Sequence, residues 1–147
     1  MSGILCAIRG GPSSQVTVAQ AVSLAQQTEL PLHFLYVVNL DFLARTTSSR
    51  TRTISEEMRQ MGESILLTAE AQAEEQGIGS QTIVRQGDVR SQIVDVCHEL
   101  GVDYLVLGRP QSQEEENVFT QAQIKEFVDN LEEQTGAKVV LSEVATE

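Results

Sequence analysis

The sequence predicts an α/β three-layer sandwich, in which helices cover both faces of a five-stranded parallel sheet. Short apolar runs typical of strands alternate along the chain with longer segments whose apolar residues recur at helical spacing. The runs Leu32–Val38 and Tyr104–Leu107 are almost continuously apolar, which is typical of strands buried on both faces. The resulting order, βαβαβαβαβ, leads to parallel strands joined by right-handed helical crossovers. No linker or repeat divides residues 1–147, so we expect a single domain.

The first strand and the first helix are separated by a glycine-rich turn. The apolar run Ile4–Ile8 ends at the turn Arg9-Gly10-Gly11-Pro12. Ser13 or Ser14 is the predicted N-cap of the helix that follows, because a serine hydroxyl accepts a hydrogen bond from a first-turn amide. Pro31 ends this helix before the second strand. Its apolar residues at helical spacing are Val18, Ala21, Val22 and Ala25.

A polar segment, Asn39–Thr53, follows the second strand, and we expect a long loop there. Its Arg45–Thr53 part is expected to be solvated, with a phosphorylation target or a lid over a ligand as alternatives. Thr53 and Glu56 form a capping box that predicts the start of the second helix, and Gly77 lies just past its end. Met58, Met61, Ile65 and Leu66 lie on one predicted face, and the Met58–Met61 pair is expected to serve in core or dimer packing.

The second half of the chain contains three more predicted strands, Gln81–Arg85, Tyr104–Leu107 and Lys138–Leu141. Gly87-Asp88 opens the helix between the first two, and Gly101 closes it. A second capping box precedes the last helix, which ends near Gly136. The box consists of Thr120 and Gln123, and the apolar residues of the two helices are Ile93, Val94, Cys97 and Leu100, then Ile124, Phe127, Val128 and Leu131.

The charge of the chain excludes two classes of partner. With 21 Asp and Glu against 10 Lys and Arg, the formal net charge is −11, and such a field repels nucleic acids and anionic membranes. No run approaches the roughly 20 apolar residues that span a bilayer, and the N-terminus lacks the basic region of a signal peptide. Cys6 and Cys97 occur in apolar patterns without a CxxC motif, so we expect buried thiols in a reducing cytoplasm.

The carboxyl edge of the sheet is the predicted binding site, because ligands of open parallel sheets bind there. The loops after the first and fourth strands read Arg9–Ser14 and Gly108-Arg109-Pro110, and each combines a glycine with an arginine that suits an anion. A phosphate at the N-terminus of the first helix would fit this arrangement. Seven of the ten basic residues fall at or just beyond a predicted carboxyl end: Arg9, Arg45, Arg50, Arg52, Arg85, Arg90 and Arg109.

The alternative is that this cluster is accidental, since arginines favour surface loops and the acidic run Glu114–Glu116 follows close behind the same edge. We expect no enzyme and no metal site. His33 and His98 lie on different elements, without a carboxylate or cysteine at ligand spacing. The chain also lacks a GxSxG elbow and a GxxxxGK[ST] phosphate loop.

Three stretches, residues 4–27, 30–38 and 84–108, resemble the universal stress protein family across nearly the whole chain. The third is the most specific, because Gly87 and its helix lead through Gly101-Val102-Asp103 into a strand that ends at Gly108. The resemblance implies strand order 3-2-1-4-5, the adenine nucleotide alpha-hydrolase-like fold. It also implies a homodimer through the last strand, in the region Lys138–Val144. For many members it implies a bound adenine nucleotide, ATP or AMP, without strong catalysis.

The resemblance and the sheet edge together give a set of candidate nucleotide- or anion-binding residues. They are Ala7, Ile8, Arg9, Gly10, Gly11, Ser13, Val37, Gly108 and Arg109. Two features depart from the family: Gly108 is the only glycine that matches its Gly-x2-Gly-x9-Gly-Ser/Thr loop, and Arg9 replaces its usual aspartate. We therefore expect a stress-response regulatory protein that binds an adenine nucleotide or another small anion. The alternative is a dimeric interaction protein that works without a nucleotide.

Overall fold

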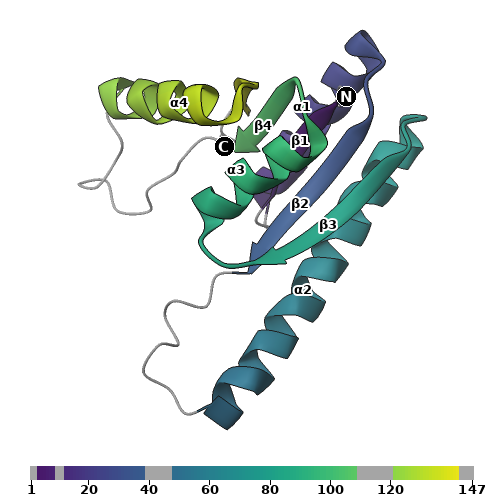
Figure 1. Ribbon diagram of the computed structural model, residues 1–147. Helices are drawn as coiled ribbons and strands as arrows, with labels where there is room; N and C mark the ends of the chain where they lie inside the picture. The colour runs from purple at the N-terminus through teal and green to yellow at the C-terminus, as the bar shows by residue number, and fades with distance from the viewer. Residues whose placement is uncertain (1–2, 9–11, 39–47, 109–120, 143–147) are drawn as a thin grey trace.

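A computed structural model describes residues 3–8, 12–38, 48–108 and 121–142 of the chain. Within these residues the strands form one sheet, in which each pair of neighbours is parallel and the order is β3-β2-β1-β4-β5 (Figure 1). The predicted fold class and strand order are thereby confirmed. The elements are β1 (Ile4–Ala7), α1 (Pro12–Thr28), β2 (Leu32–Val38), α2 (Ser48–Glu75), β3 (Ser80–Gln86), α3 (Val89–Leu100), β4 (Tyr104–Gly108), α4 (Gln121–Thr135) and β5 (Lys138–Ser142).

The hydrophobic core has two halves, one on each face of the sheet. Side chains alternate between the faces of a strand. Cys6 and Phe34 therefore pack against α1 and α2, whereas Leu5 and Leu35 pack against α3 and α4. The chain moves outward from β1 to β2 and β3, then crosses to β4 and β5 on the other side. The strand order thus reverses between β1 and β4, and this is where the fold favours a ligand.

Helix α1 begins earlier than the serine caps predict. Its first residue is Pro12, so Ser13 and Ser14 lie in the first turn and neither is the N-cap. Proline suits this first position because it has no N–H that would need a partner. The helix ends at Thr28, whose hydroxyl donates to the carbonyl of Leu24 and accepts from the amide of Leu30.

Helix α2 begins at Ser48, so the predicted cap at Thr53 and the Ser48–Thr53 part of the predicted loop Asn39–Thr53 are wrong. Residues 39–47 lie outside the described structure. With 28 residues, α2 is about 42 Å long, and its N-terminal part extends past the carboxyl ends of β2 and β3 (Figure 1). This part has no sheet beneath it and needs no apolar face. Its sequence therefore carries no helical pattern.

The buried face of α2 is also turned relative to its prediction. Leu66 is buried, and Met58 and Ile65 pack against the same half of the core, as predicted. Met61, however, is 56% exposed. Gly62 takes the central place on this face, where the ring of Tyr36 from β2 lies against the helix backbone.

Both ends of α3 match their predictions. The carboxylate of Asp88 accepts a hydrogen bond from the amide of Ser91 at 3.0 Å, and this bond lowers the pKa of Asp88. At the other end, Gly101 is left-handed, with φ 62°, and its N–H bonds the carbonyl of Cys97. Helix α4 begins one residue after Thr120, which lies outside the described residues, as do the side chains of Gln123 and Ile124. Leu131 is buried, and Phe127 and Val128 are partly buried.

No helix among the described segments is long and apolar enough to cross a membrane.

Candidate functional site

Three neighbouring strands bring predicted site residues to one edge of the sheet. Ala7 is the last residue of β1, Gly108 is the last of β4, and Val37 is the next to last of β2. In the register of the sheet, Ala7 lies between Leu35 of β2 and Leu107 of β4. The three candidate residues therefore lie close together at the carboxyl edge, next to the point where the strand order reverses. Their role in binding stays a prediction.

The structure separates Ile8 from the other predicted lining residues. Ala7 and Val37 pack with the half of the core beneath α3 and α4. Ile8 faces the opposite side, where it is buried with residues of α1 and α2. Ala7 and Ile8 therefore do not line one common pocket, since consecutive strand residues point to opposite faces.

Gly108 has a structural reason to be glycine in addition to the predicted approach of a ligand. A Cβ atom at this position would lie 3.1 Å from the hydroxyl oxygen of Thr17, a buried residue of α1. The missing side chain therefore lets the end of β4 approach the first turns of α1. This close approach brings the strand ends to the start of the helix.

The other predicted site residues and most of the basic cluster lie outside the described part of the structure. Arg9, Gly10, Gly11 and Arg109 lie outside the described residues, and so does the side chain of Ser13 in α1. Of the remaining basic cluster, Arg45 and the side chains of Arg50 and Arg52 lie outside as well.

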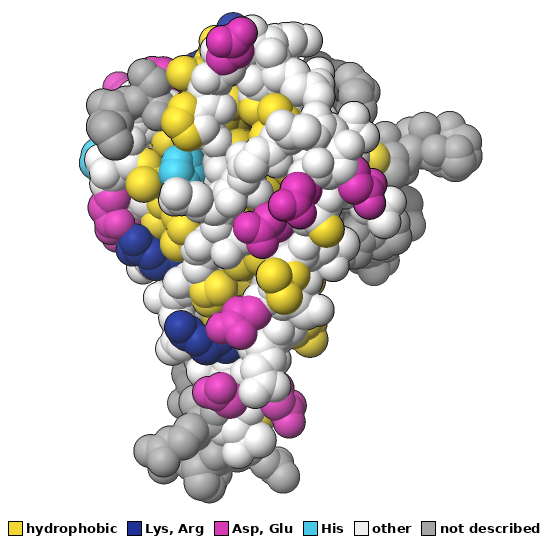
Figure 2. All heavy atoms as spheres, turned by 90° about the vertical axis from the view of Figure 1, so that its right-hand side faces the viewer, with side chains coloured by type: hydrophobic (Ala, Val, Ile, Leu, Met, Phe, Trp, Pro, Cys, Tyr) yellow, Lys and Arg dark blue, Asp and Glu magenta, His cyan; other side chains and the backbone are white. Residues whose placement is uncertain are grey.

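The two cluster arginines that can be placed both have partners on the α3 and α4 side. The guanidinium of Arg85 donates to both carboxylate oxygens of Glu99, which raises the pKa of Arg85 and lowers the pKa of Glu99. Arg90 lies over the ring of Phe127, with its guanidinium carbon 5.7 Å from the ring centre. On the face shown in Figure 2, basic side chains lie beside acidic ones. Arg85 therefore adds no uncompensated positive charge to the predicted edge.

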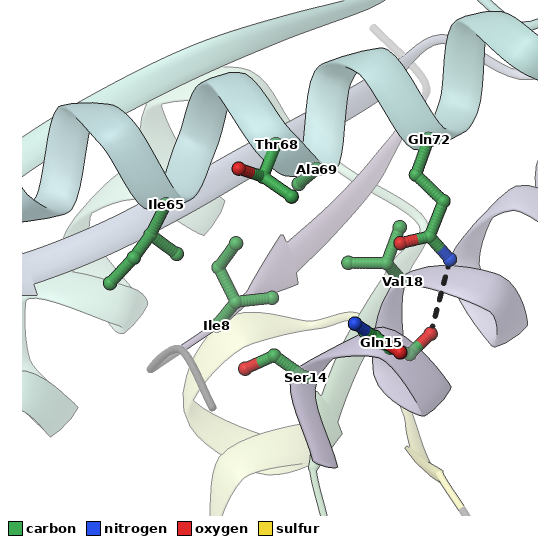
Figure 3. Close-up of a pocket in the computed structure, with 8 residues that line it drawn as sticks. All are labelled: Ile8, Ser14, Gln15, Val18, Ile65, Thr68, Ala69 and Gln72. Atoms are coloured by element: carbon green, nitrogen blue, oxygen red, sulfur yellow. Dashed lines mark hydrogen bonds between the residues drawn. The ribbon is translucent and has the colours of Figure 1, made fainter. Parts of the chain in front are cut away.

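A cleft next to this edge was not predicted from the sequence. It lies between α1 and α2, above the end of β1, and has a volume of about 280 Å³ (Figure 3). The only sequence signal on its α2 side is a pair of polar residues at i and i+4, Thr68 and Gln72, beside the buried face. The residues that line it are Ile8, Ser14, Gln15, Val18, Ile65, Thr68, Ala69 and Gln72.

The two histidines have different surroundings. Burial lowers the pKa of His33, and its Nδ1 has no hydrogen-bond partner within the described structure. His98 is exposed, and its Nε2 lies 2.6 Å from the carbonyl oxygen of Gln134, which links α3 to α4. Among the described residues, no three His, Cys, Asp or Glu side chains are grouped to hold a metal ion.

Comparison with known proteins gives one family. The model of the universal stress protein family matches residues 1–121, and no curated protein sequence matches the chain. Universal stress protein UspA from Lactobacillus plantarum is 17% identical, with a TM-score of 0.78 over 97% of each chain. A universal stress protein from Archaeoglobus fulgidus, solved in complex with dAMP, is 14% identical, with a TM-score of 0.63 over 97% of this chain and 98% of that one. A family protein from Arabidopsis thaliana, with AMP bound, is 13% identical, with a TM-score of 0.61 over 99% and 94%.

Proposed function

Because the chain belongs to the universal stress protein family, we propose that it is a stress-response regulatory protein that binds an adenine nucleotide or another small anion at the carboxyl edge of its sheet. The observation that carries this proposal is the convergence of Ala7, Val37 and Gly108 at the ends of three neighbouring strands. Related structures hold dAMP and AMP, which supports the choice of ligand. A location in the cytoplasm is part of the proposal, because both cysteines are free and buried.

The described residues suit the less charged part of a nucleotide. Ala7 and Val37 offer apolar surface to a base, and Gly108 offers backbone without a side chain. The first turn of α1 begins at Pro12, and the dipole of a helix favours an anion at its N-terminus. Arg9 and Arg109 follow β1 and β4 in the sequence and would supply charge to a phosphate. We propose a role in binding without catalysis.

We expect calorimetric titration to show AMP binding that depends on the two arginines. The double variant Arg9→Glu/Arg109→Glu should bind AMP at least about tenfold more weakly, since one charge-assisted hydrogen bond contributes about 1.5–3 kcal/mol. The acidic run Glu114–Glu116 opposes a longer phosphate chain, so ATP should bind more weakly than AMP.

The matched control is Arg59→Glu/Lys125→Glu, which changes the net charge equally at two exposed cations that pair within α2 and α4. This control should retain AMP binding. If wild-type protein binds AMP, ATP and cyclic AMP only above millimolar concentrations, or if the Arg9/Arg109 variant binds as well as wild type, nucleotide binding at this edge is wrong.

A second candidate function, a nucleotide-independent dimeric interaction protein, is favoured by the surface beside β5. β5 is an edge strand, and a groove of about 410 Å³ runs between it and α1. The lining of this groove combines apolar side chains, Val16, Ala19 and Leu24 of α1 and Val140 of β5, with Gln20, Ser23 and Gln27 of α1. A second copy of the chain paired along Lys138–Val144 would cover both the strand edge and the groove.

Native mass spectrometry of freshly purified protein is expected to show a species of twice the 16.1 kDa chain mass. Val140→Asp places a charge in the groove and should shift this species to the monomer, with an unchanged circular dichroism spectrum. Leu67→Asp is the control, because Leu67 is 63% exposed on α2 and lies outside the groove. A monomeric wild type at micromolar concentration would contradict the dimer. A retained nucleotide in the same spectrum would favour the first function.

A further inference from the structure

The cleft between α1 and α2 lies on the opposite face of the sheet from Ala7 and Val37. Ile8, Val18 and Ala69 form its floor, and each is at most 5% exposed. Figure 3 shows the side chain of Ile65 closing one side and Gln72 the other. The cleft is therefore a separate concave site, and its floor belongs to the half of the core beneath α1 and α2.

The charge of the cleft differs from that of the molecule. The chain has 21 acidic and 10 basic residues, yet none of the described residues that line the cleft is charged. An anion placed here would lose hydration without gaining an opposite charge from the described lining residues. An uncharged ring would instead replace water over the aliphatic floor. The cleft therefore favours a neutral, largely apolar ligand.

Two polar groups of α2 at the rim, the side chains of Gln72 and Thr68, are positioned to accept hydrogen bonds. The Nε2 of Gln72 donates to the backbone carbonyl of Gln15 at 3.2 Å, which fixes the orientation of the amide. Its Oε1 then points toward the Val18 side of the cleft (Figure 3). The hydroxyl of Thr68 donates to the carbonyl of Ser64, so toward a ligand it presents lone pairs.

We propose that this cleft binds a small uncharged aromatic heterocycle that carries an N–H donor. Its ring would lie on Ile8, Val18 and Ala69, and its N–H would donate to Oε1 of Gln72. The volume of about 280 Å³ lies at the lower end of ligand pockets, roughly 300–1,000 Å³, which limits the ligand to one or two fused rings. The site is additional to the nucleotide edge and does not depend on it.

Indole is the probe, because the chain contains no tryptophan and indole fluorescence can therefore be followed directly. We expect saturable binding below millimolar concentration. Benzothiophene has the same shape without the N–H and should bind about fivefold to tenfold more weakly in a competition titration. Indole-3-carboxylate, which carries a charge, should bind more than tenfold more weakly than indole.

Two variants test the assigned contacts. Gln72→Leu should remove the preference for indole over benzothiophene while the apolar ring still binds. Gln76→Leu, in the turn that follows α2 and outside the lining, should keep that preference. Ala69→Leu fills the floor and should abolish binding of both probes.

Three results would overturn the proposal. They are the absence of saturable indole binding to wild-type protein, an unchanged preference in Gln72→Leu, and displacement of indole by AMP. Displacement would make the cleft the base-binding half of the nucleotide site. Failure of AMP binding, by contrast, would leave the indole titration unchanged and would affect only the proposed function.

Discussion

Gly62→Ala is expected to lower the free energy of unfolding by about 2 kcal/mol, although alanine favours a helix by about 1 kcal/mol over glycine. An added Cβ would lie 2.3 Å from Cδ2 and 2.7 Å from Cε2 of Tyr36. The Tyr36 ring is buried between β2 and α2, so either the ring or the helix must move, and both displacements disturb a packed core. Urea unfolding followed by circular dichroism measures the difference.

Gly79→Ala is the matched control for this substitution. No atom lies within 4 Å of the Cβ it would add, and Gly79 is not among the positive-φ glycines. Its stability should stay within about 0.5 kcal/mol of wild type or rise slightly. A double-mutant cycle with Tyr36→Ala tests the cause, because the cost of Gly62→Ala should nearly vanish once the ring is gone. A Gly62→Ala protein as stable as wild type would contradict the close packing of the Tyr36 ring against position 62.

Neither cysteine of the native protein is expected to react with a thiol reagent at neutral pH. Cys6 and Cys97 are 0% and 1% exposed, and burial raises the pKa of both thiols, that of Cys97 to about 12. Only the thiolate reacts, and moving the pKa of Cys97 from 9.0 to about 12 reduces its thiolate fraction about a thousandfold. Reaction with Ellman's reagent should therefore be at least about a thousandfold slower in buffer than in urea.

Single Cys6→Ala and Cys97→Ala variants assign the two rates, because each leaves one thiol. Any labelling in buffer should follow transient opening of the fold, and so should accelerate in the destabilised Gly62→Ala protein. A native rate within tenfold of the rate in urea would contradict the burial of that thiol. Slow labelling would instead exclude direct sensing of oxidants by these cysteines in the folded protein.

Elements with local signals were predicted closely from the sequence. β2 has the predicted bounds, Leu32–Val38, because it is covered on both faces and is almost continuously apolar. The start and end of α3 follow from Asp88 and Gly101, whose capping bonds involve residues within four positions along the chain.

Features that depend on tertiary packing were missed. The start of α2 extends past the carboxyl ends of β2 and β3, and the sequence of Ser48–Thr53 contains no apolar residue that would mark a helix. The exposed position of Met61 results from the contact between Gly62 and Tyr36, which the helical repeat alone does not reveal. The strand ends at the candidate site were predicted because the topology brings them together. The cleft was not, since its closing bond joins Gln15 and Gln72, which are 57 residues apart.

The two outer strands of the sheet, β3 and β5, have consequences for how copies of the chain can assemble. Pairing β5 of one copy with β5 of another uses the same surface twice and forms a twofold assembly that closes on itself. Pairing β3 of one copy with β5 of the next would leave an unused edge at each end and would build an open fibre. The exposed side chains on β3 include Gln81, Thr82 and Gln86, all polar, whereas the groove beside β5 is lined in part by the apolar Val16, Ala19, Leu24 and Val140. The sheet is thus suited to forming a closed dimer through β5, to which no third copy is added.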